Sequence, residues 1–221
     1  MRSTRTASRS PATRKASASR ASGKPRFARQ LADERRQELI VATIECLKRY
    51  GHDGLSVRSI SAQAGVSIGL INHHFPNKSE LVAQAYRCFN AQLVAGLRLA
   101  VQRAGGSPRE RLTAFFRASF SPPNLDRDVL AAWIVFWGLY RHSPQIQRVH
   151  RETYGGYLEL IRTMLSELEA ATGPFGIAGH LAAVGLTALL DGLWLEWCLD
   201  PTTFDPGQAL ALCERWVDSL R

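Results

Sequence analysis

Apolar residues beyond residue 30 recur at spacings of three and four, in stretches separated by glycine and proline. This periodicity is typical of amphipathic helices, and the alternating apolar and polar runs of strands are missing. The pattern therefore predicts an all-α fold. The expected helices, about nine in number, cover residues 33–50, 56–63, 67–74, 78–103, 108–119, 126–142, 144–170, 176–199 and 206–219.

Two short helices in this series are joined by a tight turn. Ser56 can cap the first, Ile60 lies on its apolar face, and Gly65 suits a left-handed turn after it. Ser67 can cap the second helix. Such a pair is a helix-turn-helix, whose second helix enters the major groove of DNA. The same outline also occurs as a plain packing motif in all-α proteins.

The second of these helices carries small or uncharged polar side chains on its surface. Ser67, Asn72 and His73 offer hydrogen-bond donors and acceptors that suit base edges. Gly69 lets the backbone come close to the bases. These residue types favour contact with DNA in a groove.

The next helix begins with a capping signal. Asn77 can cap it, and Glu80, three residues on, completes a capping box. Lys78 lies in the first turn, where backbone N–H groups favour a phosphate. Residues 31–81 contain as many acidic as basic side chains, so Lys78 and Arg58 also fit ordinary surface positions.

The stretch SVRSISAQAGVSIGLINHHFPNKSEL resembles the DNA-binding signature of the TetR family of transcriptional regulators along its whole length. The similarity covers roughly residues 33–85. It implies a homodimer that binds a palindromic operator in double-stranded DNA and is released by a small-molecule effector. It also implies a DNA-binding domain over residues 31–80 and a helical ligand-binding and dimerisation domain over residues 81–221.

The end of the recognition helix, INHHF, resembles that of the choline-responsive repressors of the glycine-betaine pathway. The resemblance to these repressors implies that the major groove of DNA is contacted by Ser67, Gly69, Leu70, Asn72 and His73. It places Arg58, His74 and Lys78 at or near DNA phosphates. The adjacent histidines also suggest a metal site. Neighbours on a helix point about 100° apart, however, and no cysteine or acidic cluster joins them, so we expect no metal.

The last two helices are strongly apolar. Small residues such as Gly185 and Ala188 alternate with leucines in residues 176–199, and residues 206–219 add Leu212 and Trp216. A helix that is apolar nearly all round is buried on most sides. These helices fit an intramolecular core, and the resemblance to TetR proteins makes them the twofold dimer interface.

Aromatic residues gather in two segments of the second domain. Trp133, Phe136, Trp137 and Tyr140 follow helical spacing. Trp194 and Trp197 lie in ALLDGLWLEWCLD, beside Asp191, Glu196 and Asp200. Aromatic walls with a carboxylate suit a quaternary ammonium ion, although such spacing also fits plain core packing. The segment LLDGLWL resembles the choline-responsive repressors, which favours a cage in which Asp191 pairs with the cation. A structural hydrogen bond is the other role that Asp191 fits.

Positive charge is concentrated at the start of the chain. The formal net charge is +9, and residues 1–30 contain nine arginines and lysines and no acid, so the remaining residues are neutral overall. We expect a disordered basic arm here that adds phosphate contacts. The same composition also resembles an organellar transit peptide.

Several functional classes lack their signatures. The sequence has no glycine-rich phosphate loop and no hydrolase or metalloprotease motif, so we expect neither an enzyme nor a cofactor. The apolar runs are too short to cross a membrane, and the four scattered cysteines indicate a reducing compartment. We expect a cytoplasmic, nucleoid-associated bacterial regulator. The alternatives are a TetR-like repressor for an unrelated apolar ligand and a basic architectural DNA-binding protein, which needs no aromatic interior.

Overall fold

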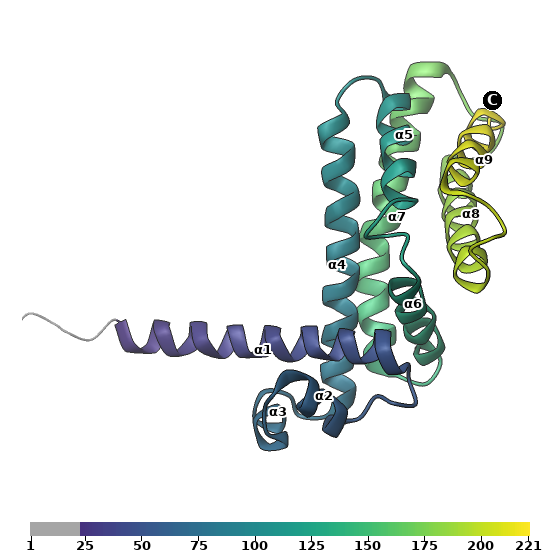
Figure 1. Cartoon of the computed structure of the whole chain (residues 1–221). Coiled ribbons are helices and arrows are strands. Elements are labelled where there is room, and N and C mark those ends of the chain that lie inside the picture. Colours follow the sequence, from purple (N-terminus) through teal and green to yellow (C-terminus); the bar gives the residue numbers. More distant parts are fainter. Residues whose placement is uncertain (1–22) are drawn as a thin grey trace, which may run out of the picture.

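The computed structural model describes residues 23–221, which form helices and no strand. The all-α prediction is confirmed. The elements are α1 (Gly23–Tyr50), α2 (Val57–Ala64), α3 (Ile68–His74), α4 (Lys78–Ala104), α5 (Pro108–Ser119), α6 (Arg127–Tyr140), α7 (Pro144–Thr172), α8 (Gly179–Leu199) and α9 (Pro206–Asp218). Figure 1 shows α1 to α3 as a head at one end of a longer body built from α4 to α9.

The first helix is longer than the sequence pattern predicts. It begins at Gly23, whereas the prediction began it at residue 33 and assigned residues 23–30 to a disordered arm. The apolar pattern starts only near Leu39, but the earlier residues include good helix formers, and a proline at position 25 is tolerated in a first turn. The predicted disorder of residues 1–22 falls outside the described residues.

Local capping signals are confirmed in the helix-turn-helix. Ser56 caps α2, and Ser67 caps α3 by accepting a hydrogen bond from the Leu70 amide. Gly65 ends α2 with φ of 64°, a left-handed conformation that strains other residues. The two short helices therefore meet at the turn that the sequence predicts.

The long helix α4 joins the head to the body and packs against α1, α5 and α7. Buried apolar residues form two clusters, one inside the body and one that combines the head with the lower ends of α6 and α7. Trp133 packs against both clusters. Trp133 therefore joins the core of the body to the core shared with the head.

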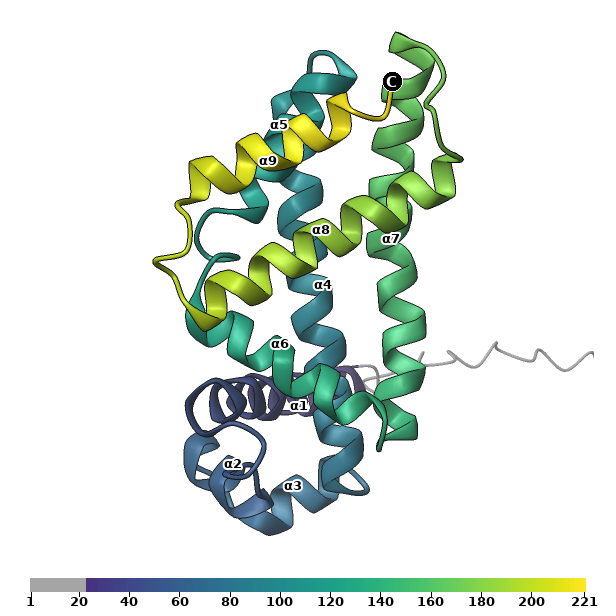
Figure 2. The same ribbon diagram turned by 90° about the vertical axis from the view of Figure 1, so that its right-hand side faces the viewer.

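Helices α8 and α9 lie across the outer side of the body, as Figure 2 shows. By length and composition alone, α8 is apolar enough to cross a membrane, although core helices of water-soluble proteins pass the same test. The prediction from single apolar runs missed this because it did not count the whole helix. Only a third of its most apolar window is buried within the described part of the chain.

Candidate DNA-binding surface and effector cavity

The recognition helix α3 presents most of the residues predicted for the groove. Ser67, Gly69, Asn72 and His73 are exposed, and Leu70 is half-buried. Ile71 points the other way and is buried in the head core. The helix therefore offers a polar outer face on an apolar anchor, which suits insertion into a groove.

Ile68 is a candidate contact that sequence reasoning missed. It begins α3, yet it is 42% exposed on the same helix as the polar groove residues. An exposed isoleucine on such a helix suits the methyl group of thymine. No clear signal in the sequence marks it, because its spacing of three from the buried Ile71 predicts the same apolar face, whereas its place in the first turn of α3 leaves it exposed.

The C-terminal end of α3 is held by the first helix. Arg36 donates a hydrogen bond to the backbone carbonyl of His74, and its guanidinium carbon lies 4.4 Å from the centre of the Phe75 ring. Burial lowers the pKa of His74, and the positive charges of His73 and Arg36 lower it further. His74 is therefore neutral at pH 7, and in a contact with a phosphate its ring would donate a hydrogen bond without adding a positive charge.

The two cations predicted for phosphates differ in their surroundings. Arg58 is exposed on α2. The Lys78 ammonium donates a hydrogen bond of 3.0 Å to the backbone carbonyl of Leu55, so its side chain links α4 to the loop before α2. To bind a phosphate, the Lys78 ammonium must either release the Leu55 carbonyl or use one of its other two N–H donors.

A small cavity of about 20 Å³ lies inside the body, where α4, α6, α7 and α8 meet. Its volume holds one water molecule. The residues that line it are Asn90, Leu93, Val94, Trp133, Trp137, Tyr154, Tyr157, Asp191 and Trp194. Four of the seven residues predicted for a ligand site, Trp133, Trp137, Asp191 and Trp194, are thus brought together.

The other three predicted ligand residues do not line this cavity. Phe136 is fully buried in the head-side core, where its ring centre lies 4.6 Å from that of Tyr86. Tyr140 is partly exposed two turns beyond Trp133, and Trp197 packs at the edge of the body core. The four aromatics of α6 span a wide arc of the helix surface, so they contact two different layers.

Five cavity residues were not predicted from the sequence. Asn90, Leu93 and Val94 come from α4, and Tyr154 and Tyr157 come from α7. The tyrosines follow helical spacing, but nothing in the sequence pairs that stretch of α7 with the tryptophans of α6 and α8. Only tertiary packing brings them together.

Asp191 is the acidic group of the cavity. Burial raises the pKa of its carboxyl to about 6, and no hydrogen bond or cation among the described side chains offsets that cost. Its charge contributes to the raised pKa values of Tyr154 and Tyr157, after the larger effect of burial. At pH 7 the cavity therefore holds a carboxylate that is mostly ionised and has no ionic or hydrogen-bonding partner within residues 23–221.

His150 of α7 is half-buried between its neighbours. Its Nδ1 lies 2.7 Å from the Tyr86 hydroxyl, and its ring stacks on that of Tyr154 with centres 4.8 Å apart. Burial lowers its pKa, so the ring is neutral at pH 7. The sequence gives no indication of this contact, because Tyr86 and His150 are 64 residues apart.

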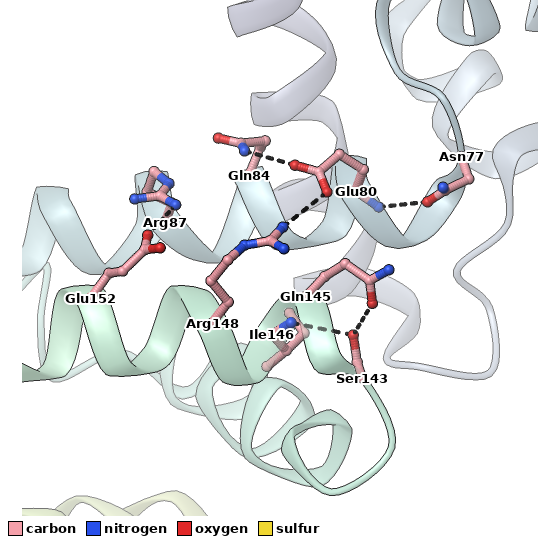
Figure 3. Close-up of polar contacts among 9 residues, drawn as sticks. All are labelled: Asn77, Glu80, Gln84, Arg87, Ser143, Gln145, Ile146, Arg148 and Glu152. Atoms are coloured by element: carbon pink, nitrogen blue, oxygen red, sulfur yellow. Dashed lines mark hydrogen bonds and ion pairs between the residues drawn. The ribbon is translucent and has the colours of Figure 1, made fainter.

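Helices α4 and α7 are also joined by exposed polar contacts near the head, as Figure 3 shows. Arg148 lies 3.3 Å from Glu80, and Arg87 pairs with Glu152. Asn77 caps α4 by accepting from the Glu80 amide, as predicted. The predicted capping box is wrong, because the Glu80 carboxylate contacts Gln84 and Arg148 instead of the cap.

Comparison with known proteins matches both halves of the chain. Residues 39–85 match the model of bacterial regulatory proteins of the TetR family, and residues 108–221 match the BetI-type transcriptional repressor C-terminal domain. The HTH-type transcriptional regulator BetI of Serratia proteamaculans is 31% identical over 83% of this chain and 90% of its own length. The chain belongs to the TetR family. It is a DNA-binding transcriptional regulator and, as predicted, not an enzyme.

Solved structures agree with the TetR fold. A transcriptional regulator from Pseudomonas aeruginosa PAO1 is 47% identical, with a TM-score of 0.78 over 90% of this chain and 96% of its own. A regulator from Saccharomonospora viridis, solved in complex with choline, has a TM-score of 0.73 over 84% of this chain and 96% of its own. The second is 20% identical, a likeness that shows the fold alone.

The BetI-type segment of this TetR-family chain exposes an apolar stripe along α8. Its members recur at spacings of three and four, and the largest side chains are 38 to 65% exposed. They are Leu181, Val184, Ala188, Gly192, Leu195 and Leu199. Leu212 of α9 is similarly exposed. An exposed apolar stripe of this length is typical of an interaction surface.

Proposed function

We propose that the protein is a homodimeric repressor that binds a palindromic operator and releases it when a small quaternary ammonium ion, choline in the first instance, enters the cavity. The observation that carries the proposal is Asp191, an ionised group with no partner among the described residues, in a cavity walled by aromatic rings. The curated relatives named BetI and the neighbour solved with choline support the same effector class.

A quaternary ammonium ion fits this arrangement because it offers no hydrogen bond. Its recognition depends on ring faces and on fixed negative charge. Trp133, Trp137 and Trp194 supply rings, and Asp191 supplies the charge. The Trp194 indole N–H is already satisfied by the Ser119 carbonyl at 3.0 Å, so that ring is held in place before a ligand arrives.

The size of the cavity connects binding to regulation. A volume of about 20 Å³ is too small for any trimethylammonium compound, so the cation must bind an expanded body. A ligand that prefers one conformation shifts the population toward it. Trp133 is the wall residue that transmits this change, since its ring lies 5.2 Å from Phe89 and 5.9 Å from Tyr86 in the head-side core.

The stripe on α8, together with Leu212, supports the homodimer. A twofold interface uses the same surface on both subunits, and the stripe is continuous, apolar and unpaired within residues 23–221. Two heads in such a dimer present two recognition helices to half-sites about 34–36 Å apart. Expansion of the body changes that separation and lowers operator affinity.

The alternatives explain less of the molecule. An apolar effector would leave the half-buried Asp191 carboxylate without a counter-charge, at a cost of up to about 3 kcal/mol. An architectural DNA-binding protein needs no internal cavity. We retain the apolar effector as the second candidate, because most of the cavity wall is aromatic or aliphatic.

Calorimetric titration of choline into the free protein tests the effector directly. We expect saturable binding by the unmodified protein, a loss of at least tenfold in affinity for Asp191→Asn, and no change for Glu196→Gln. Glu196 is the matched control, because it is an exposed acid on the same helix. Failure to bind choline, or equal binding by Asp191→Asn, would contradict the cation site.

A further inference from the structure

Besides the Asp191 carboxylate, two fully buried polar groups of the cavity wall have no hydrogen-bond partner among the described residues. They are Nδ2 of Asn90 on α4 and the hydroxyl of Tyr157 on α7. Asn90 is 7% exposed and Tyr157 is 6% exposed, so water does not satisfy them from outside. Each buried group without a partner costs about 1–3 kcal/mol.

Two other polar groups near the cavity have partners. The Tyr86 hydroxyl is bound to His150, and the Trp194 indole N–H donates to Ser119. The Asn90 amide also approaches Tyr86. Burial raises the pKa of Tyr86 to about 12, and the nearby Asn90 amide lowers it in part. Within the geometry of the described side chains, however, its Nδ2 makes no hydrogen bond.

We infer that Asn90 and Tyr157 determine the specificity of the effector site by binding an oxygen atom on the quaternary ammonium ion. The inference rests on the proposed function, because it concerns a second part of the same cavity. Nδ2 of Asn90 can only donate, and the Tyr157 hydroxyl can donate or accept. An uncharged hydroxyl oxygen satisfies both at once.

The charge in the cavity selects among oxygen substituents. Asp191 lies close enough to add to the raised pKa of Tyr157, although burial is the larger cause. A carboxylate on the effector would meet this negative charge at short range. The site therefore favours a hydroxyl-bearing cation over a zwitterion and over a cation that carries alkyl groups only.

Choline and ethyltrimethylammonium form the decisive pair of ligands, because they share one skeleton and differ by a hydroxyl group. Calorimetric titration of the full-length protein is expected to give at least tenfold tighter binding of choline. The analogue has no oxygen atom, so the Asn90 amide and the Tyr157 hydroxyl stay without a hydrogen-bond partner when it binds. Tyr157→Phe and Asn90→Leu are each expected to bring this ratio toward one by weakening the binding of choline far more than that of ethyltrimethylammonium. Tyr140→Phe, outside the cavity, keeps the ratio.

The outcomes separate this inference from the proposed function. If the unmodified protein binds neither cation, the proposed effector class is wrong. If it binds both equally, or if both variants keep the ratio, the cation cage stands and the oxygen site is overturned. An equal loss of affinity for both cations in Tyr157→Phe also overturns it, because that result would mean that the Tyr157 hydroxyl supports the structure of the cavity and does not bind the oxygen atom. Thermal melting checks that each variant is folded, and removal of an unpaired hydroxyl is expected to keep or raise the midpoint.

Discussion

The Tyr86 hydroxyl of α4 lies 2.7 Å from Nδ1 of His150 on α7, and the two rings are parallel within 2°. The His150 ring also stacks on the ring of Tyr154. Tyr154 lines the cavity, and Tyr86 is buried in the core shared with the head. One histidine thus connects the wall that meets the effector with the helix that carries the head.

Replacement of His150 by phenylalanine tests this connection. The ring is kept and the hydrogen bond to Tyr86 is lost, so we expect choline to bind free protein with an affinity within about threefold of the original. The choline concentration that releases half of the operator is expected to rise at least fivefold, because the coupling between the sites falls. Titrations with and without operator give both values.

His142→Phe is the control for this variant, since His142 is an exposed histidine just before the same helix. It is expected to behave as the unmodified protein does. An His150→Phe protein that releases operator at the original choline concentration would show that the histidine carries no coupling.

Asp191→Asn is expected to stabilise the free protein at pH 7. The carboxyl has a pKa of about 6 in the folded state and 3.8 in the unfolded reference, so ionisation is disfavoured by folding. The free energy of unfolding therefore decreases as the pH rises from about 4 to about 6. The shift corresponds to roughly 3 kcal/mol at pH 7 as an upper estimate. Urea unfolding at pH 7 measures the gain, which Glu196→Gln should not reproduce.

The same carboxyl predicts how choline affinity depends on pH. Below about pH 6 it is protonated and no longer attracts the cation, so affinity should decrease as the pH falls from 7 to 5. The tyrosines that face it have raised pKa values and stay neutral in this range, and His150 is neutral at pH 7. Titrations across this range should show a much weaker dependence in Asp191→Asn. An identical pH profile in that variant would assign the effect to another group.

Val184→Asp is expected to separate the subunits. Val184 is 51% exposed in the middle of the α8 stripe, and a charge there would be buried in a twofold interface. Light scattering should give a monomer, with loss of operator binding. Leu99→Asp, at an exposed leucine of α4, is the control and should remain a dimer. A dimeric Val184→Asp protein would place the interface elsewhere.

Asn72→Ala is expected to relax sequence choice in DNA. Asn72 is exposed on α3, and a side-chain amide can read adenine with two hydrogen bonds. Discrimination at one base-pair position should fall by about 1–3 kcal/mol, while affinity for unrelated DNA stays the same. Binding to a set of single-base operator variants measures this. Unchanged discrimination would mean that a different residue reads the bases.

Features fixed by short-range chemistry were predictable from the sequence. Ser56, Gly65, Ser67 and Asn77 each act within four residues of their own position, and the helix-turn-helix follows from them. The helices after residue 107 were also predictable, from their capping residues and from the spacing of their apolar residues. Such signals need no knowledge of the tertiary structure.

The cavity was only partly predictable, because its wall comes from four helices. Trp133, Trp137 and Trp194 are conspicuous in the sequence, whereas Asn90 looks like any polar residue on α4. Phe136 was misplaced because helical spacing gives a face and does not say which layer that face meets. The role of His150 depends on a contact with Tyr86 across the body.

The most direct test of the account is fluorescence anisotropy of the purified protein on a labelled fragment of its own promoter region, with unrelated DNA as competitor, before and after addition of choline. The account predicts specific binding that choline abolishes in the unmodified protein and does not abolish in Asp191→Asn. Specific binding that choline leaves intact, or that it releases equally in Asp191→Asn, would contradict the claim that a cation at Asp191 controls the operator.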